Sequence, residues 1–382
     1  MKISRTGSKE PAWWYRAETS ATARVLRPVS KVYAWAVERR FQRAQPYRSA
    51  LPVICVGNLT TGGTGKTPFA LLLAEELKRL GERPAFLTRG YGGRHAGPRW
   101  VDRDLDLAAD ISDEALLLSR VAPTLIARDR AAGARAIEAA AGAPSVIVMD
   151  DGLQNPMLVK DLTIALVDAR RGIGNGEVLP AGPLRASLAF QLNLADAVIV
   201  NSAPHAAAHA AESAAGWKHQ FPGPVLETRP CAEGDTAWIG DARLVAYAGI
   251  ANPSRFFTLL ERLGGRIAES LVFPDHHRFT EKDAERILGA GARHEALLVT
   301  TEKDWVRLLG RGGRRGELRD TSRVLPIRLA LDERDAGRLA GLIQAAFQTT
   351  RAQRRPPVSS SGLPRGLNVP HAPISEKGGP TE

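Results

Sequence analysis

Short apolar runs alternate with segments of helical periodicity along much of the chain. Each run has the length of a β-strand and ends at glycine, proline or polar residues, whereas the segments between the runs are rich in Ala, Leu and Arg. This alternation is typical of parallel strands joined by covering helices. The expected strands lie at 51–56, 85–88, 124–127, 145–149, 162–167 and 197–200, and a helix is expected at 68–80.

The pattern changes around residues 221–241, where proline, glycine and threonine interrupt it. Further strands expected at 243–248 and 296–300 flank helical segments and indicate a second, smaller α/β domain. Near the C-terminus, proline, serine and glycine dominate without periodicity, which predicts disorder. The expected units are an N-terminal amphipathic segment at 1–48, a core domain at 49–228, a smaller α/β domain at 229–348 whose last helix is free to return to the core, and a disordered tail at 349–382.

Aromatic and basic residues occur together between Pro11 and Phe41. They predict an amphipathic helix whose apolar face is flanked by cations, with Trp14 and Trp35 among the rings suited to the headgroup boundary of a membrane. A helix packed on its own domain fits the same pattern, so both interpretations stay open here. The apolar positions at helical spacing are Val29, Val32, Tyr33, Ala36 and Val37.

The composition narrows the class of protein without naming a partner. Lys and Arg number 52 against 41 Asp and Glu, and the formal net charge of +11 favours an anionic partner such as a nucleotide, a nucleic acid or a membrane surface. A solvated Arg-rich surface fits the same charge. The cysteines Cys55 and Cys231 do not suggest a disulfide framework or a zinc site. Without a run of about 18 apolar residues or a signal-peptide core, we expect a cytoplasmic catalytic body.

The strongest chemical signal is Thr-Gly-Gly-Thr-Gly-Lys-Thr at residues 61–67, between an expected strand and an expected helix. Glycines in such a loop let backbone N–H groups face phosphate oxygens, Lys66 reaches the terminal phosphates, and Thr67 offers a hydroxyl to Mg²⁺. The pattern predicts a P-loop fold with a doubly wound parallel sheet, although Thr60 stands where the strict motif has glycine. The expected nucleotide-binding residues are Thr60, Thr61, Gly62, Gly63, Thr64, Gly65, Lys66 and Thr67.

Two carboxylates, Asp150 and Asp151, end another expected strand. Oxygen ligands at the carboxyl edge of a sheet, beside a phosphate loop, suit Mg²⁺, although Asp151-Gly152 is also a common turn. A guanine-reading Asn-Lys-x-Asp element does not follow, because the lysine in Thr301-Glu-Lys-Asp304 is shifted by one place. We therefore expect ATP and Mg²⁺ as the cofactors.

Several further motifs occur in order along the chain. They are Val56-Gly-Asn-Leu-Thr-Thr-Gly-Gly-Thr-Gly-Lys-Thr-Pro68, Thr88-Arg-Gly-Tyr-Gly92, Ser112-Asp-Glu114, Ala127-Arg-Asp-Arg130, Asp150-Asp-Gly-Leu-Gln154, Gly174-Asn-Gly176, Leu179-Pro-Ala-Gly-Pro-Leu-Arg185, Phe273-Pro-Asp-His-His277 and Thr300-Thr-Glu-Lys-Asp304. Together these motifs resemble those of the tetraacyldisaccharide 4'-kinase family of lipid A biosynthesis. The resemblance runs from about Trp13 to Gln348 and departs from the family pattern at Asn155, where His is usual, and at Ala186, where Glu is usual.

The resemblance implies transfer of the ATP γ-phosphoryl group to the 4'-hydroxyl of a tetraacyl glucosamine disaccharide 1-phosphate. It also implies a peripheral or monotopic position on the cytoplasmic face of the inner membrane. The proton acceptor implied by the family is an aspartate paired with a histidine, which match Asp113 and His276. The candidate Mg²⁺ or phosphate-network carboxylates are Glu114, Asp150 and Asp151, and the candidate phosphate-holding arginines are Arg128, Arg130 and Arg185.

Two other classes of function compete with this reading. A membrane-recruited regulatory ATPase of the MinD type shares the loop, but Thr61 replaces the additional lysine that such ATPases carry. A nucleic-acid-binding protein would fit the basic charge, but the sequence contains no recognised reader motif. We expect a lipid disaccharide phosphate and an anionic membrane surface as partners, no nucleic acid, and no obligate protein partner.

Overall fold

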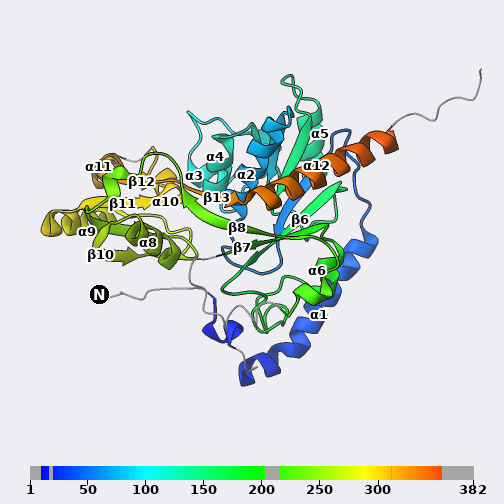
Figure 1. Ribbon diagram of the computed structural model, residues 1–382, viewed down its shortest axis with the longest axis horizontal. Coiled ribbons are helices and arrows are strands. Elements are labelled where there is room, and N and C mark those ends of the chain that lie inside the picture. Colours follow the sequence, from blue (N-terminus) through cyan, green and yellow to red (C-terminus); the bar gives the residue numbers. More distant parts are fainter. Residues whose placement is uncertain (1–9, 17–19, 203–215, 311, 355–382) are drawn as a thin grey trace, which may run out of the picture.

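The computed structural model describes residues 10–16, 20–202, 216–310 and 312–354 (Figure 1). Within these residues a nine-stranded sheet has the order β13-β8-β7-β6-β1-β5-β2-β4-β3. Its strands run parallel except at the two edges, where β13 is antiparallel to β8 and β3 to β4. The bounds are β1 (Val53–Asn58), β2 (Pro84–Thr88), β3 (Arg99–Trp100), β4 (Thr124–Ile126), β5 (Val146–Asp150), β6 (Leu162–Asp168), β7 (Ala197–Asn201), β8 (Val225–Ala232) and β13 (Ile327–Leu331).

Both faces of this sheet are covered, which is why its central strands appear as continuous apolar runs. Ile54 and Val56 of β1 pack with one layer of helices, whereas Val53 and Cys55 point to the opposite layer. The first layer contains α2 (Lys66–Arg79), α4 (Asp113–Ser119) and α12 (Glu333–Arg354). The second layer contains α5 (Arg130–Glu138) and α6 (Leu188–Asn193).

A second sheet, of four parallel strands, has the order β10-β9-β11-β12. Helix α8 packs on one face, and α9 and α11 pack on the other. Helix α10 packs against α4 of the larger unit through Val306, so the two units meet at that contact. The bounds are β9 (Arg243–Ala248), β10 (Arg266–Val272), β11 (Leu297–Thr301), β12 (Arg323–Leu325), α8 (Pro253–Arg262), α9 (Glu281–His294), α10 (Glu302–Val306) and α11 (Gly313–Thr321).

The N-terminal region contains a short turn of helix and the long helix α1, which lies along the edge of the larger unit (Figure 1). Ser20 caps α1, because its hydroxyl oxygen accepts a hydrogen bond from the N–H of Ala23 at 3.1 Å. Among the described residues, no helix is both long enough and apolar enough to span a membrane. The remaining bounds are η1 (Ala12–Tyr15), α1 (Ala21–Arg43), α3 (Ala108–Ile111), η2 (Lys218–Gln220) and η3 (Ala237–Ile239).

The structure divides the chain differently from the expected boundaries at two places. Strand β8 crosses the boundary expected between residues 228 and 229, and β13 joins the larger sheet after the smaller unit. The last helix, α12, follows β13 and packs on the larger unit, a return that the sequence left open. Helix α12 continues to Arg354, past the expected start of the tail at residue 349, and residues 355–382 lie outside the described part. The chain therefore leaves the larger unit at β8 and re-enters it at β13, which gives two connections between the units.

Candidate active site

The phosphate loop joins β1 to α2, as the sequence predicts, and polar side chains of the larger unit hold its shape. The Thr64 hydroxyl donates to Asn58 Oδ1, and Asn58 Nδ2 donates to the carbonyl of Gly62 at 3.2 Å. Asn201, at the end of β7, donates from Nδ2 to the carbonyl of Thr64 at 3.0 Å. Gly65 has φ 94°, a left-handed conformation that glycine adopts without strain. The loop is thus fixed by its own sheet before any ligand arrives.

Lys66 and Arg185 converge on one carboxylate oxygen. Lys66 Nζ lies 3.0 Å and Arg185 Nη1 lies 2.6 Å from Asp151 Oδ1. Burial raises the pKa of Asp151, but the charges of Lys66 and Arg185 outweigh it and hold this pKa well below its usual range. The phosphates of a nucleotide would compete with Asp151 for both cations, because all are anions reached by the same side chains.

Asp150 has the character of a magnesium ligand. Its Oδ2 accepts a hydrogen bond from the Thr88 hydroxyl at 3.1 Å, while its buried Oδ1 has no hydrogen-bond partner among the described residues. Burial raises the pKa of this carboxyl. A hard cation would satisfy the orphaned oxygen, so Asp150 fits Mg²⁺ together with the buried Thr67 at the start of α2.

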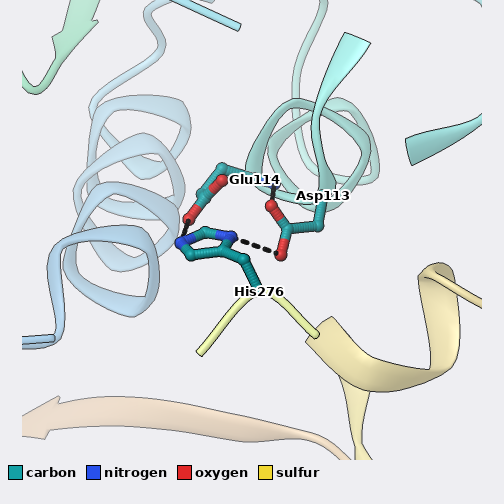
Figure 2. Close-up of side chains that lie close together, drawn as sticks. All are labelled: Asp113, Glu114 and His276. Carbon is teal, nitrogen blue, oxygen red and sulfur yellow. Dashed lines mark hydrogen bonds and ion pairs between the residues drawn. The ribbon is translucent and has the colours of Figure 1, made fainter. Parts of the chain in front are cut away.

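Asp113 and His276 come together across the two units (Figure 2). Asp113 is the first residue of α4, and His276 follows β10, with Nδ1 3.3 Å from Asp113 Oδ2. Ser112 and His276 both have positive φ values, 99° and 57°, which non-glycine residues adopt at a cost. Tyr91 presents its ring edge-on to the imidazole, with centroids 6.1 Å apart. The structure therefore joins two residues that the sequence separates widely.

Arg307, which was not predicted from the sequence, contacts Asp113 directly and is linked to His276 through the carbonyl of Gly249. Its Nε donates to Asp113 Oδ2 at 2.9 Å, and Nη2 donates to the same oxygen. Its Nη1 donates at 2.7 Å to the carbonyl of Gly249, which also accepts the backbone N–H of His276 at 3.1 Å. Asp304, three residues earlier, pairs with Arg307 at 2.7 Å. That i, i+3 charge pair, directly after the Thr300–Asp304 motif, was the signal available in the sequence.

The charges around the pair lower the pKa of Asp113 and raise the pKa of His276. Burial raises the pKa of Asp113, but the hydrogen bond with His276 and the charges of Arg307 and Lys303 bring it well below its usual value. The hydrogen bond to Asp113 raises the pKa of His276. A carboxylate that stays ionised orients the imidazole and stabilises its protonated form. With Nδ1 turned to Asp113, the Nε2 atom is the one left to accept a proton.

Glu114 lies with this pair rather than with the aspartates at the end of β5. Its Oε1 accepts from Lys303 Nζ at 2.6 Å and lies 3.8 Å from His276 Nε2 (Figure 2). Burial raises the pKa of Glu114. Ligand atoms of Asp113, Glu114 and His276 lie within 4.8 Å of one another, a spacing compatible with a metal ion. Lys303 and Arg307 already neutralise the two carboxylates, which disfavours a cation there.

The candidate arginines Arg128 and Arg130, and the residues Asn155 and Ala186 that depart from the family pattern, do not contact the Asp113–His276 pair in any described interaction. Arg130 is buried and donates to the carbonyls of Ala127 and Asp150, so it supports the strand ends rather than facing a ligand. Arg128 is exposed. Asn155 accepts from the N–H of Met157 in a turn, and Ala186 is buried with its carbonyl accepting from Gln191.

The residues between His276 and the phosphate loop form a direct connection. The carbonyl of Gly249 accepts from His276, and two residues later Ala251 lies against the loop, because a Cβ added to Gly63 would be 2.7 Å from Ala251 Cβ. His276 and the phosphate loop are thus linked through residues 249–251 of the smaller unit.

Comparison with known proteins identifies the family of this chain. Residues 22–347 match the family model LpxK, described as tetraacyldisaccharide-1-P 4'-kinase. Tetraacyldisaccharide 4'-kinases of Parvibaculum lavamentivorans and Methylorubrum extorquens are 45% and 46% identical, covering 77% and 89% of this chain and 84% and 99% of theirs. The LpxK crystal structure from Aquifex aeolicus, 23% identical, has a TM-score of 0.65 and covers 85% of this chain and 99% of that chain, which confirms the expected fold class. The chain therefore belongs to the tetraacyldisaccharide 4'-kinase family.

Proposed function

We propose that this chain transfers the γ-phosphoryl group of ATP to the 4'-hydroxyl of a tetraacyl glucosamine disaccharide 1-phosphate, a step of lipid A biosynthesis. Family membership supports the reaction, and the Aquifex LpxK structure was solved with ATP. The observation that carries the mechanism is the 3.3 Å approach of His276 Nδ1 to Asp113 Oδ2 where the two units meet. A kinase for a sugar hydroxyl needs a proton acceptor at that place.

In this mechanism His276 Nε2 accepts the proton of the attacking hydroxyl while Asp113 stays ionised. Lys66 leaves Asp151 and pairs with the terminal phosphates, and Arg185 contributes charge from the same side. Thr67 and Asp150 would hold Mg²⁺, which when bound neutralises phosphate charge. Glu114 keeps Lys303 in place next to the pair.

The decisive experiment follows ATP turnover with and without an acylated disaccharide 1-phosphate. We expect transfer of labelled phosphate to the lipid and little ATP hydrolysis in its absence. Hydrolysis at one rate with or without the lipid, and no labelled lipid, would contradict the kinase and support the regulatory ATPase. Stimulation by nucleic acid instead of lipid would support the third class of function.

We also propose that helix α1 lies on an anionic membrane surface, on the cytoplasmic face of the inner membrane. One face of α1 packs on the core, since Ser30 Oγ accepts from the N–H of Ala181 at 3.0 Å. The opposite side exposes Val25 by 76% and Trp35 by 59%, together with Val29, Val32 and Tyr33. Exposed apolar residues on a helix with basic neighbours suit the headgroup boundary. The packed-helix interpretation thus describes one face of α1, and the proposed membrane contact is assigned to the exposed face.

Trp14 does not belong to that surface. It is buried, and its Nε1 donates to the carbonyl of Pro180 at 3.2 Å. A membrane test therefore uses Val25→Glu with Trp35→Glu, and Leu105→Glu as the control, because Leu105 is 77% exposed in a distant loop. We expect the double variant to lose sedimentation with anionic liposomes and the control to keep it. Equal sedimentation of all three proteins would contradict membrane binding by this face.

A further inference from the structure

The carboxylate of Glu10 and the guanidinium of Arg171 lie next to Gly62, in the middle of the phosphate loop. Gly62 has φ 90°, and a Cβ added there would lie 2.0 Å from Glu10 Oε1 and 3.1 Å from Arg171 Nη1. Glu10 precedes the N-terminal helical turn, whereas Arg171 follows β6. Residues 22–347 match the family model, so Glu10 lies before the matched part. A carboxylate and a guanidinium thus lie directly beside the phosphate-binding loop.

Arg171 is held in this position from several sides. Its Nη1 donates to Glu10 Oε2 at 2.7 Å, and its guanidinium carbon lies over the Tyr15 ring, 5.2 Å from the centroid. The Tyr15 hydroxyl donates to the same Glu10 oxygen at 3.1 Å. The backbone N–H of Arg171 donates to the carbonyl of Asp168 at 3.2 Å. The side chain of Arg171 is 23% exposed, so it is packed but still open to a ligand.

The segment that carries Glu10 is anchored independently of this ion pair. The N–H of Asn175 donates to the carbonyl of Trp14 at 2.7 Å, and the Trp14 ring donates to Pro180. The same connection reaches the phosphate loop, because the N–H of Thr61 donates to the carbonyl of Pro183 at 2.9 Å. Glu10 therefore stands beside Gly62 on a fixed support, and its carboxylate shows that an anion is accepted between Arg171 and the loop.

We propose that Arg171 is a further catalytic residue, which stabilises the negative charge on the γ-phosphoryl group during transfer. The inference rests on the proposed kinase function. Backbone N–H groups and the lysine of such loops hold the β- and γ-phosphates, so a guanidinium at Gly62 lies beside the transferred group. A planar guanidinium binds two phosphate oxygens at once, and arginines placed in this way accelerate phosphoryl transfer strongly. Glu10 occupies the anion position until the nucleotide replaces it.

The step balances without participation of Arg171 in bond making. A bond forms between the acceptor oxygen and the γ-phosphorus, and the bond from the γ-phosphorus to the bridging oxygen breaks, leaving its electron pair on ADP. The hydroxyl proton moves to His276. Arg171 keeps its protons throughout and contributes only charge and hydrogen bonds, which strengthen as the equatorial oxygens gain charge.

The experiment compares Arg171→Ala and Arg171→Met with Arg170→Ala. Arg170 is the matched control, since it is the neighbouring arginine, it is exposed, and no role in the site is assigned to it. The methionine variant keeps an unbranched stem over Tyr15, so it separates lost charge from lost packing. The measurements are the single-turnover rate of transfer to the lipid and the affinity for ADP with and without aluminium fluoride, a mimic of the transferring phosphoryl group.

For both Arg171 variants we expect the transfer rate to fall about 10²–10³-fold and the tightening of ADP by aluminium fluoride to disappear. The affinity for ADP alone should stay within about threefold, because Arg171 lies at the terminal phosphate. Arg170→Ala should match the wild type. Glu10→Gln should tighten ATP binding severalfold, since the competing anion is removed.

Transfer rates of both Arg171 variants within about threefold of the wild type would overturn the inference, as would equal losses in Arg170→Ala. A parallel loss of ADP affinity with and without aluminium fluoride would also overturn it, because that pattern indicates a structural role. A wild-type protein that labels no lipid would contradict the kinase itself, whereas an active wild type with active Arg171 variants contradicts Arg171 alone.

Discussion

The phosphate loop is formed by one continuous stretch of chain, whereas the Asp113–His276 pair joins side chains from two units. The loop is shaped by Asn58 and Asn201, which belong to the same sheet. The pair depends on Arg307, which follows α10 of the smaller unit, and on the packing of α10 against α4. The phosphate loop is therefore held mainly within one unit, whereas the Asp113–His276 pair exists only through the contact between the two units. Movement of one unit relative to the other would therefore change the Asp113–His276 contact while the phosphate loop keeps its shape.

The loop side of this comparison is tested most strongly by Lys66→Ala. We expect this variant to abolish lipid phosphorylation, because the terminal phosphates lose their main side-chain partner. The protein should remain folded, since among the described residues Lys66 forms an ion pair only with the partly exposed Asp151. The measurement is labelled-phosphate transfer, with a circular dichroism spectrum to check folding.

Arg79→Ala is the control for that change. Arg79 ends the same helix, its side chain is 73% exposed, and its pair with Glu76 is a surface pair that contributes little. Wild-type transfer by Lys66→Ala would show that the loop does not hold the reacting phosphate. Loss of transfer in Arg79→Ala as well would show that the assay reports damage to α2 rather than to the site.

Substitutions of Asp113 or His276 should cause a large but incomplete loss of the transfer rate. Asp113→Ala and His276→Ala should each reduce the single-turnover rate by about 10²–10⁴-fold, the usual contribution of a general base. ATP affinity should change little, because both residues lie outside the loop. The double variant should lose little more than the worse single variant, since two residues that act as a unit are not additive.

The rates of the wild type, the two single variants and the double variant decide whether Asp113 and His276 act together. Fully multiplicative losses would show that Asp113 and His276 work independently, and a fully active His276→Ala would remove it from the site. His277→Gln is the matched control, because this neighbouring imidazole pairs with Asp283 at 2.9 Å instead of with Asp113. It should keep the wild-type rate.

The same contrast explains how far the sequence could be read. The phosphate loop and Asp150 were predictable because each lies at the end of its own apolar strand, the loop directly after β1 and Asp150 as the last residue of β5. The expected strands at the centre of the larger sheet are buried on both faces, and their apolar runs identify them. Strand β8 was taken for a break in the pattern, since Glu227 and Arg229 alternate with buried residues and Pro230 interrupts it. Its neighbour β13 is antiparallel and lies far along the chain.

The second half of the site was only partly predictable. Asp113 and His276 were found through the family motifs, because their own surroundings in the sequence contain no chemical signal. Arg307 contacts Asp113 across 194 positions, so its local i, i+3 pairing with Asp304 does not reveal that contact. Arg171 was missed for the same reason, since its partner Glu10 is 161 positions away. Pairs that form only when two segments fold together cannot be read from spacing.

The smallest expected effect is the dependence of the transfer rate on pH. The hydrogen bond to Asp113 raises the pKa of His276 above its ordinary value of 6.5, and the imidazole accepts a proton only when it is neutral. The rate should therefore rise with pH from 6.5 upward and level off above the raised pKa. In Asp113→Asn the rise should move to lower pH on top of the lower maximal rate, because the charge that raises the pKa of His276 is removed.

Stability should respond to pH in the opposite direction, which distinguishes the pair from an unrelated titration. A pKa that is higher in the folded than in the unfolded protein gives a stabilisation that is complete below the unfolded value near 6.5. This stabilisation is lost as the pH rises through the folded pKa. Rate profiles and unfolding midpoints of wild type, Asp113→Asn and His277→Gln test this. A rate profile unchanged in Asp113→Asn, or shifted equally in His277→Gln, would show that the rate-controlling proton is not held by the contact between the two units.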